Sequence, residues 1–174
     1  MTALTGAGLL ALALLLGGCT PEPAPEPTPT PPFASEEEAF AAAEATYRAY
    51  VDALNQVDLS DPETFEPVFG WTTGEANAGE RKSLSQMHAD GWSVSGRTSV
   101  VGARLADFSP KDGEVELAVC ADVSGVDVRD SNGISVVSPD RPDLQASFVT
   151  FVSSDQTGTG LVIASIGGSD QECE

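Results

Sequence analysis

The chain has 174 residues, and its 27 acidic and 8 basic side chains give it a formal net charge of −19 at pH 7. Nucleic acid and anionic lipid surfaces are both bound through basic patches, and only Arg81 and Lys82 are adjacent among the basic residues. The composition therefore excludes nucleic-acid binding and electrostatic docking on a membrane. It predicts a solvated acidic surface, with a basic partner or loose divalent-cation binding as alternatives.

An uncharged apolar run over residues 9–16 leads into Gly17, Gly18 and Cys19. The run is shorter than the roughly 20 residues of a membrane-spanning helix, and it ends in small residues as cleaved signals do. Leu16 to Cys19 resemble a bacterial lipobox. That resemblance implies a lipoprotein signal peptide over residues 1–18 and a lipidated Cys19 at the new N-terminus. An uncleaved membrane anchor and an ordinary secretory signal are the alternatives.

The lipobox implies at least two acyl chains, such as palmitate, which hold a protein on a membrane stably. The first region of a signal peptide normally carries Lys or Arg, and residues 1–5 contain neither. Either the start codon lies further upstream, which we favour, or the signal is atypical. Residues 19–33 comprise the lipidated cysteine and a proline-rich stretch of polyproline II character, which reaches roughly 40 Å at about 3.1 Å per residue. We interpret it as a stalk on the extracytoplasmic face of the cell membrane, with a proline-rich docking ligand as the alternative.

Cys120 and Cys173 remain as an even pair in an exported chain. Oxidising compartments favour pairing, and closing a loop of this length stabilises a fold by roughly 4 kcal/mol. A metal site is the alternative, but neither His nor a further Cys lies nearby in the sequence. The pattern predicts a disulfide between them.

Helical signals occupy the first half of the region after the stalk. Ser35 and Glu38 form a capping box, and the apolar residues that follow have helical spacing over 35–55. Asp61 and the proline after it start a short helical turn. Thr72 with Glu75 predicts a further capping box, opening a surface helix that ends near residue 90.

From Trp92 onward the apolar period changes to two, which indicates strands. A shift in this alternation beside Gly102 predicts a bulge that turns Val101, Ala103 and Leu105 inward along one long strand starting at Trp92. The remaining predicted strands and turns are a turn at 109–113, strands at 115–123, 144–152 and 161–166, a hairpin tip at 130–133 and a loop at 139–142.

Three helices followed by an antiparallel meander predict an α+β domain. This order, together with the lipobox, the stalk, the stretches EEEAFAAAEATYRAY (36–50) and VCADVSGV (119–126) and the terminal Cys173, resembles small actinobacterial lipoproteins with an NTF2-like (SnoaL/ketosteroid-isomerase-like) domain. The resemblance implies a cone over residues 34–174, with N-terminal helices packed on a bent antiparallel sheet of about four strands. The fold hosts enzymes, binders and scaffolds, so it does not by itself define a function.

Isomerases of this fold use a carboxylate base with a tyrosine and a protonated acid. Asp122 is the one candidate base here, and a structural role for it is favoured because the presumed disulfide shares its side of the strand. His88 is the only histidine, and its place near a helix end favours a capping or surface role. No metal site, cofactor or phosphate loop is indicated.

The leading hypothesis is therefore a lipid-anchored, non-enzymatic accessory domain that binds a protein or envelope component. The second is a binder of a small hydrophobic ligand in the cone, and the third is an isomerase or cyclase based on Asp122. For a ligand cavity, the expected lining residues are Tyr47, Trp71, Trp92 and Asp122.

Overall fold

The computed structural model describes residues 33–169 and 171–173. Three α-helices and a 3-10 turn precede six strands, which confirms the predicted α+β class. The helical elements are α1 (Glu36–Leu54), η1 (Pro62–Phe65), α2 (Glu66–Gly70) and α3 (Gly74–Ala89). The strands are β1 (Ser93–Ser95), β2 (Ser99–Ser109), β3 (Glu114–Asp122), β4 (Asp127–Arg129), β5 (Leu144–Ser153) and β6 (Leu161–Gly168). The predicted signal peptide, the lipidated Cys19 and the stalk up to residue 32 lie outside the described residues.

Helix α1 begins at the predicted capping box. The Ser35 hydroxyl accepts from Glu38 N at 3.2 Å, and the Glu38 carboxylate accepts from Ala34 N at 2.9 Å. Three successive acidic residues in its first turn interact favourably with the positive end of the helix dipole. The buried side of α1 carries Ala39, Ala43, Thr46, Tyr47, Tyr50, Val51 and Ala53.

The predicted capping box of Thr72 and Glu75 is wrong. Thr73 is the N-cap of α3, without a side-chain capping bond, and Thr72 is buried. The backbone here is held against β6 instead, because Thr73 N donates to Ile163 O at 2.7 Å and Ile163 N donates to Trp71 O at 2.9 Å. A tertiary pairing has displaced the local capping pattern.

The main sheet has the antiparallel order β2-β3-β5-β6. Its β2–β3 register jumps from Val100 opposite Ala121 to Gly102 opposite Cys120, which confirms the predicted bulge. Val101 is the extra residue and is 55% exposed, so the expectation that it turns inward is wrong. An inserted residue has no partner across the ladder, and its side chain is therefore free to face solvent.

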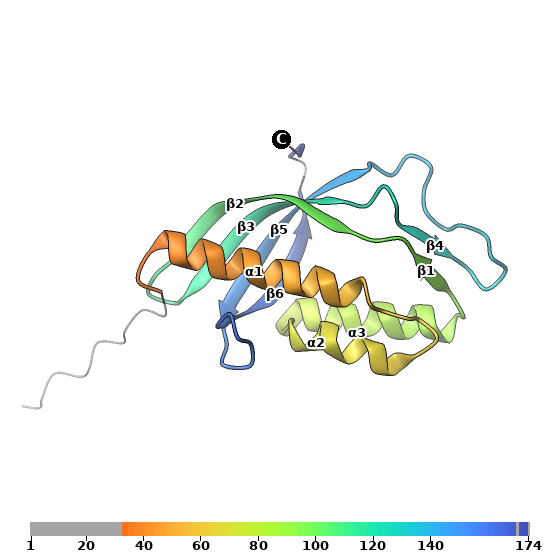
Figure 1. Ribbon diagram of the computed structural model, residues 1–174, viewed down its shortest axis with the longest axis horizontal. Coiled ribbons are helices and arrows are strands. Elements are labelled where there is room, and N and C mark those ends of the chain that lie inside the picture. Colours follow the sequence, from red (N-terminus) through yellow and green to blue (C-terminus); the bar gives the residue numbers. More distant parts are fainter. Residues whose placement is uncertain (1–32, 170, 174) are drawn as a thin grey trace, which may run out of the picture.

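Helices and sheet form two layers, with the helices on one side of the sheet and the C-terminus on the other (Figure 1). The side chains between the layers are almost fully buried, among them Val115, Leu117, Val149, Phe151, Leu161 and Ile163. Burial of each such side chain stabilises the fold by roughly 1.5–3 kcal/mol relative to exposure. The core thus lies along the inner face of β3, the second half of β5 and the first half of β6.

Strands β1 and β4 form a separate two-stranded ribbon beside the C-terminal end of α3 (Figure 1). The single long strand predicted from Trp92 is therefore two strands, β1 and β2, separated by a bend at Gly96, whose φ is +84°. The predicted hairpin tip is confirmed, since Gly133 N donates to Asp130 O at 2.9 Å. The ribbon is the feature of the fold that shapes the candidate site.

Candidate functional site: a pocket under the ribbon

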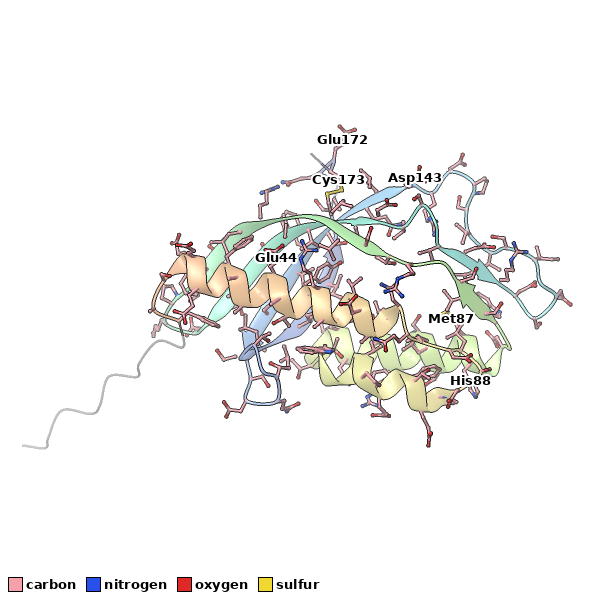
Figure 2. All side chains as sticks on the ribbon, in the orientation of Figure 1. Glu44, Met87, His88, Asp143, Glu172 and Cys173 are labelled. Carbon is pink, nitrogen blue, oxygen red and sulfur yellow. A yellow bond between two sulfur atoms is a disulfide. The ribbon has the colours of Figure 1, made fainter. Side chains whose placement is uncertain are left out.

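A pocket of about 240 Å³ lies between the end of α1, helix α3 and the β1–β4 ribbon. We call it the ribbon pocket. Its walls are mostly apolar, and Glu80 is the one ionisable side chain among the lining residues. These are Leu54, Asn55, Val57, Leu59, Glu80, Leu84, Met87, Val94, Gly96, Thr98, Val126 and Val128. Figure 2 shows Met87 at the end of α3 that faces the ribbon.

The ribbon is held over the helices by a polar clamp that the sequence did not reveal. The Asn55 amide nitrogen donates to Thr98 O at 2.9 Å, and its amide oxygen accepts from Thr98 N at 2.8 Å. These two bonds join the C-cap of α1 to the segment between β1 and β2. In the loop between β3 and β4, the Val123 and Val126 carbonyl oxygens accept from the Arg141 guanidinium at 2.6 Å and 2.9 Å.

Glu80 of α3 is held in the pocket wall by Tyr50 of α1. The Tyr50 hydroxyl, on a residue only 4% exposed, donates to Glu80 Oε1. Burial raises the pKa of Glu80, although the hydrogen bond from Tyr50 acts in the opposite direction. Burial also raises the pKa of Tyr50, and the neighbouring Glu80 carboxylate raises it further. Tyr50 is therefore a protonated donor at physiological pH.

Among the described residues that line the pocket, Glu80 is the one whose side chain could transfer a proton. The Tyr50 hydroxyl already donates its proton to Glu80, and the Asn55 amide already makes both of its hydrogen bonds with the Thr98 backbone. Oxyanion stabilisation requires donors aimed at the reacting atom, and neither of these side chains meets that condition. The arrangement is suited to binding a polar group inside an apolar pocket.

The four residues expected to line a cavity do not belong to the ribbon pocket. Tyr47 is 7% exposed in the core, where burial raises its pKa to about 12. Trp71 and Trp92 are half-buried and contact the edge of the same core. Large rings fill space between packed layers, so they are poor indicators of an empty volume.

Asp122 points away from the helices, because it shares the outer face of β3 with Cys120 while Val119 and Ala121 face inward. The Asp122 carboxylate accepts from Ser124 N at 2.9 Å. Hydrogen bonds from the side chain and backbone of Ser124 hold the pKa of Asp122 below its usual value. Asp122 therefore does not line the ribbon pocket, and the hydrogen bond from Ser124 gives it the structural role that the sequence analysis favoured.

The predicted disulfide is present, with the Cys120 and Cys173 sulfurs 2.05 Å apart. It lies on the side of the sheet opposite the helices, where Figure 2 labels Cys173. His88 also has a structural role, since its Nδ1–H donates to Leu59 O at 2.7 Å and its ring meets Phe65 edge-on.

Within residues 33–169 and 171–173, no three His, Cys, Asp or Glu side chains gather as metal ligands. In the same described part, none of the helices combines the length and apolarity needed to span a membrane.

Sequence reasoning missed Glu80, although the signal was present. Ala76, Leu84 and Met87 mark the apolar side of α3, and Glu80 lies four residues from both Ala76 and Leu84. Residues four apart share a helix face. An acid within an otherwise apolar stripe is the pattern that would have identified it.

No protein-family model and no curated protein sequence matches the chain. Among solved structures, a proposed aromatic ring hydroxylase from Novosphingobium aromaticivorans matches over 78% of this chain and 96% of its own, with a TM-score of 0.51 and 11% identity. The intermembrane space region of the chloroplast protein ARC6 matches over 75% and 97%, with a TM-score of 0.50 and 13% identity. These likenesses concern the fold, which is an NTF2-like cone as the sequence resemblance implied.

We expect Glu80→Gln to stabilise the protein at pH 7 and to have much less effect near pH 4. The folded state raises the pKa of Glu80, so folding favours its protonated form. The resulting penalty is absent below the unfolded-state value of about 4.5 and grows as pH rises through the raised folded value. A neutral amide keeps an oxygen for Tyr50 and avoids this penalty.

Urea unfolding of the full chain at both pH values measures the effect, with Glu75→Gln on the same helix as the control for losing one negative charge. Equal pH dependence in the two variants would show that the environment of Glu80 does not disfavour its charge.

Proposed function

We propose that the protein is a lipid-anchored extracytoplasmic binding domain that holds a compact apolar molecule in the ribbon pocket. The observation that carries this proposal is an apolar pocket with one ionisable lining residue, Glu80, held in place by Tyr50. Ligand pockets typically combine apolar walls with few placed polar groups. A volume of about 240 Å³ is small for such a pocket, which restricts the ligand to a compact molecule.

The polar group of the ligand follows from the lone pairs of Glu80. Tyr50 uses Oε1, and Oε2 makes no hydrogen bond among the described residues. A ligand donor such as an amine or hydroxyl group would bond this oxygen and would favour the ionised form of Glu80, which accepts hydrogen bonds only. Leu54, Leu84 and Val128 would contact its apolar part.

The cellular location in this proposal is supported by the N-terminal sequence and by the disulfide. Residues 1–18 are the proposed signal peptide, Cys19 bears the lipid, residues 19–33 form the stalk, and the binding domain spans residues 34–174. A disulfide between Cys120 and Cys173 is consistent with an oxidising compartment outside the cytoplasm. An origin in an actinobacterium rests on the sequence resemblance alone.

An enzymatic function has less support. The proposed base, Asp122, lies on the outer face of the sheet and cannot reach the ribbon pocket. The other hypothesis is binding of a protein or envelope component, which would use the surface of the fold and not the ribbon pocket.

Native mass spectrometry of the full chain, extracted in detergent from the envelope of its own host, tests ligand binding. We expect a bound organic molecule, released on denaturation. Loss of a charge-assisted hydrogen bond, worth about 1.5–3 kcal/mol, would weaken its retention at least tenfold in Glu80→Gln. Glu75→Gln should retain it. A bare wild-type protein, or equal occupancy in both variants, would refute the pocket as the binding site.

We expect Cys19→Ala to move the protein from the membrane fraction to the soluble fraction almost completely. The substitution removes the sulfur that carries the diacylglyceryl group, and no described helix can span a membrane. Fractionation with immunoblotting measures the shift, and Cys120→Ala is the control because it leaves the lipobox intact. Continued membrane retention of Cys19→Ala would refute lipid anchoring.

A further inference from the structure

Strand β6 forms one border of the main sheet, and only the first half of its outward edge is covered. The segment Trp71–Thr73 pairs with this edge at Ile163, through Ile163 N to Trp71 O and Thr73 N to Ile163 O. Beyond Ile163 the ladder to β5 contains a bulge, and the strand then continues to Gly168. Helix α3 lies against β6 (Figure 1).

The register identifies which backbone groups of the second half face outward. Ser169 N donates inward to Ala146 O, and residues along an antiparallel edge alternate between inward and outward pairs. Gly168 opposite Ser147 and Ile166 opposite Val149 are therefore the outward-facing positions. Among the described residues, neither Ile166 nor Gly168 makes a backbone hydrogen bond to the α2–α3 region. Two donors and two acceptors are open at this edge.

A groove of about 230 Å³ runs beside the open half. We call it the β6 groove. One wall is a single stripe of α3, and the other is the strand itself. Its residues are Glu75, Ala76, Gly79, Glu80, Ser83, Ser165 and Ile166. The small residues leave room there, since a Cβ added at Gly79, Gly167 or Gly168 would meet nothing within 4 Å.

The two borders of the sheet differ in how they are protected. The β2 border carries Arg104 and Asp107 and two register irregularities, which are features that discourage pairing with another chain. The open half of β6, from Ser165 to Gly168, contains neither a charged residue nor proline. An unprotected edge is a template for an added strand.

We propose that the β6 groove binds an extended segment of a partner protein by strand addition to Ile166–Gly168, and that this segment carries basic side chains on the face that meets α3. Main-chain bonds would come from Ile166 and Gly168, and alternate side chains would face the α3 stripe. Ile166, which is 37% exposed, and the small Ala76 would pack against the aliphatic stems of these basic side chains. Glu75 at the same wall would pair with their charged ends.

Charge selects this occupant over the two that the chain itself could supply. A second copy would place its own Glu75 in an equally acidic setting, on a chain of net charge −19. The proline-rich stalk carries Glu22 and Glu26, and its prolines lack the N–H donors that an added strand needs. This proposal does not depend on ligand binding in the ribbon pocket.

A synthetic octapeptide that alternates lysine and valine tests the proposal on the full chain in detergent. At about 0.15 M salt, where exposed charges are screened beyond about 8 Å, we expect saturable binding by fluorescence anisotropy. Hydrogen exchange should show new protection at Ile166 and Gly168 and none along β2. The same peptide with N-methyl groups at alternate positions keeps the charge but loses ladder donors, and should bind at least tenfold more weakly.

Two variants with a matched control separate strand addition from general attraction to an acidic protein. Gly168→Pro removes an outward N–H, which a strand border tolerates, and should lower affinity at least tenfold. Glu75→Lys should lower it about tenfold, whereas Glu66→Lys on α2, with the same charge change, should stay within twofold. Absence of binding, equal affinity for the N-methylated peptide, or protection of β6 by self-association alone would each overturn the proposal.

Discussion

Replacing both Cys120 and Cys173 by alanine is expected to lower the free energy of unfolding by about 4 kcal/mol. The two residues are 53 positions apart, and the cross-link restricts a correspondingly large loop in the unfolded chain. The bond also holds the end of the chain against the middle of β3, where Cys120 is paired with Ala146 and Gly102. Its loss would mainly increase the conformational entropy of the unfolded chain. It would also release the C-terminal tail from β3.

Urea unfolding with and without reductant measures this prediction. Reductant should shift the midpoint of the wild-type protein to that of the double variant, and should leave the double variant unchanged. A wild-type midpoint that does not respond to reductant, together with free thiols in an alkylation assay, would contradict the cross-link.

Replacing Gly96 by alanine is expected to cost about 2–5 kcal/mol of stability and to abolish ligand retention in the ribbon pocket. The residue has a φ of +84°, and an added Cβ would lie 1.9 Å from the carbonyl oxygen of Gly125. The backbone atoms on both sides of this contact cannot move apart without separating the β1–β2 bend from the β3–β4 loop. Gly96 itself and Val126 line the pocket, so the same shift would open its wall.

Gly125→Ala is the matched control for this substitution. Its added Cβ would meet nothing within 4 Å, and its backbone does not have a positive φ. Thermal unfolding and native mass spectrometry of both variants decide the outcome. Equal melting temperatures for the two would show that the close approach at Gly96 does not constrain the ribbon.

The ribbon and the groove give the two proposed binding functions separate structural bases. The ribbon pocket depends on the Asn55 clamp and on the bend at Gly96, whereas the β6 groove depends on the register of β6 and on the small residues of α3. Glu80 lies in the lining of both. Gly96 lies in the ribbon pocket and Gly168 lies on β6, so variants at these two positions should affect one function each, whereas a variant at Glu80 changes the lining of both sites.

Elements with strong local signals were predicted well. The capping box at Ser35 and the helical spacing after it locate α1 to within about one residue at each end, because the bonds that start a helix join near neighbours. The bulge beside Gly102 was also predicted, since a shift in alternation is visible in the sequence. The direction of Val101 was not, because only the pairing with β3 identifies the inserted residue.

Predictions failed where a distant segment competes with a local pattern. Thr72 has the sequence of an N-cap, but its backbone pairs with β6, about 90 residues away. The break between β1 and β2 likewise depends on the approach of Gly125 to Gly96. The aromatic residues proposed for a cavity, such as Tyr47, fill the core, and the void lies where the ribbon leaves the sheet.

By itself the sequence determined the acidic surface, the α+β class, the first helix and the cysteine pair, because composition, period and capping act over a few residues. It also carried the signal for Glu80 as an acid in an apolar stripe. Only the tertiary structure decided that Glu80 meets Tyr50, that β1 pairs with β4, and that half of β6 stays open. These features depend on which surfaces meet and which stay exposed once the helices have packed on the sheet. A local sequence pattern does not encode that outcome.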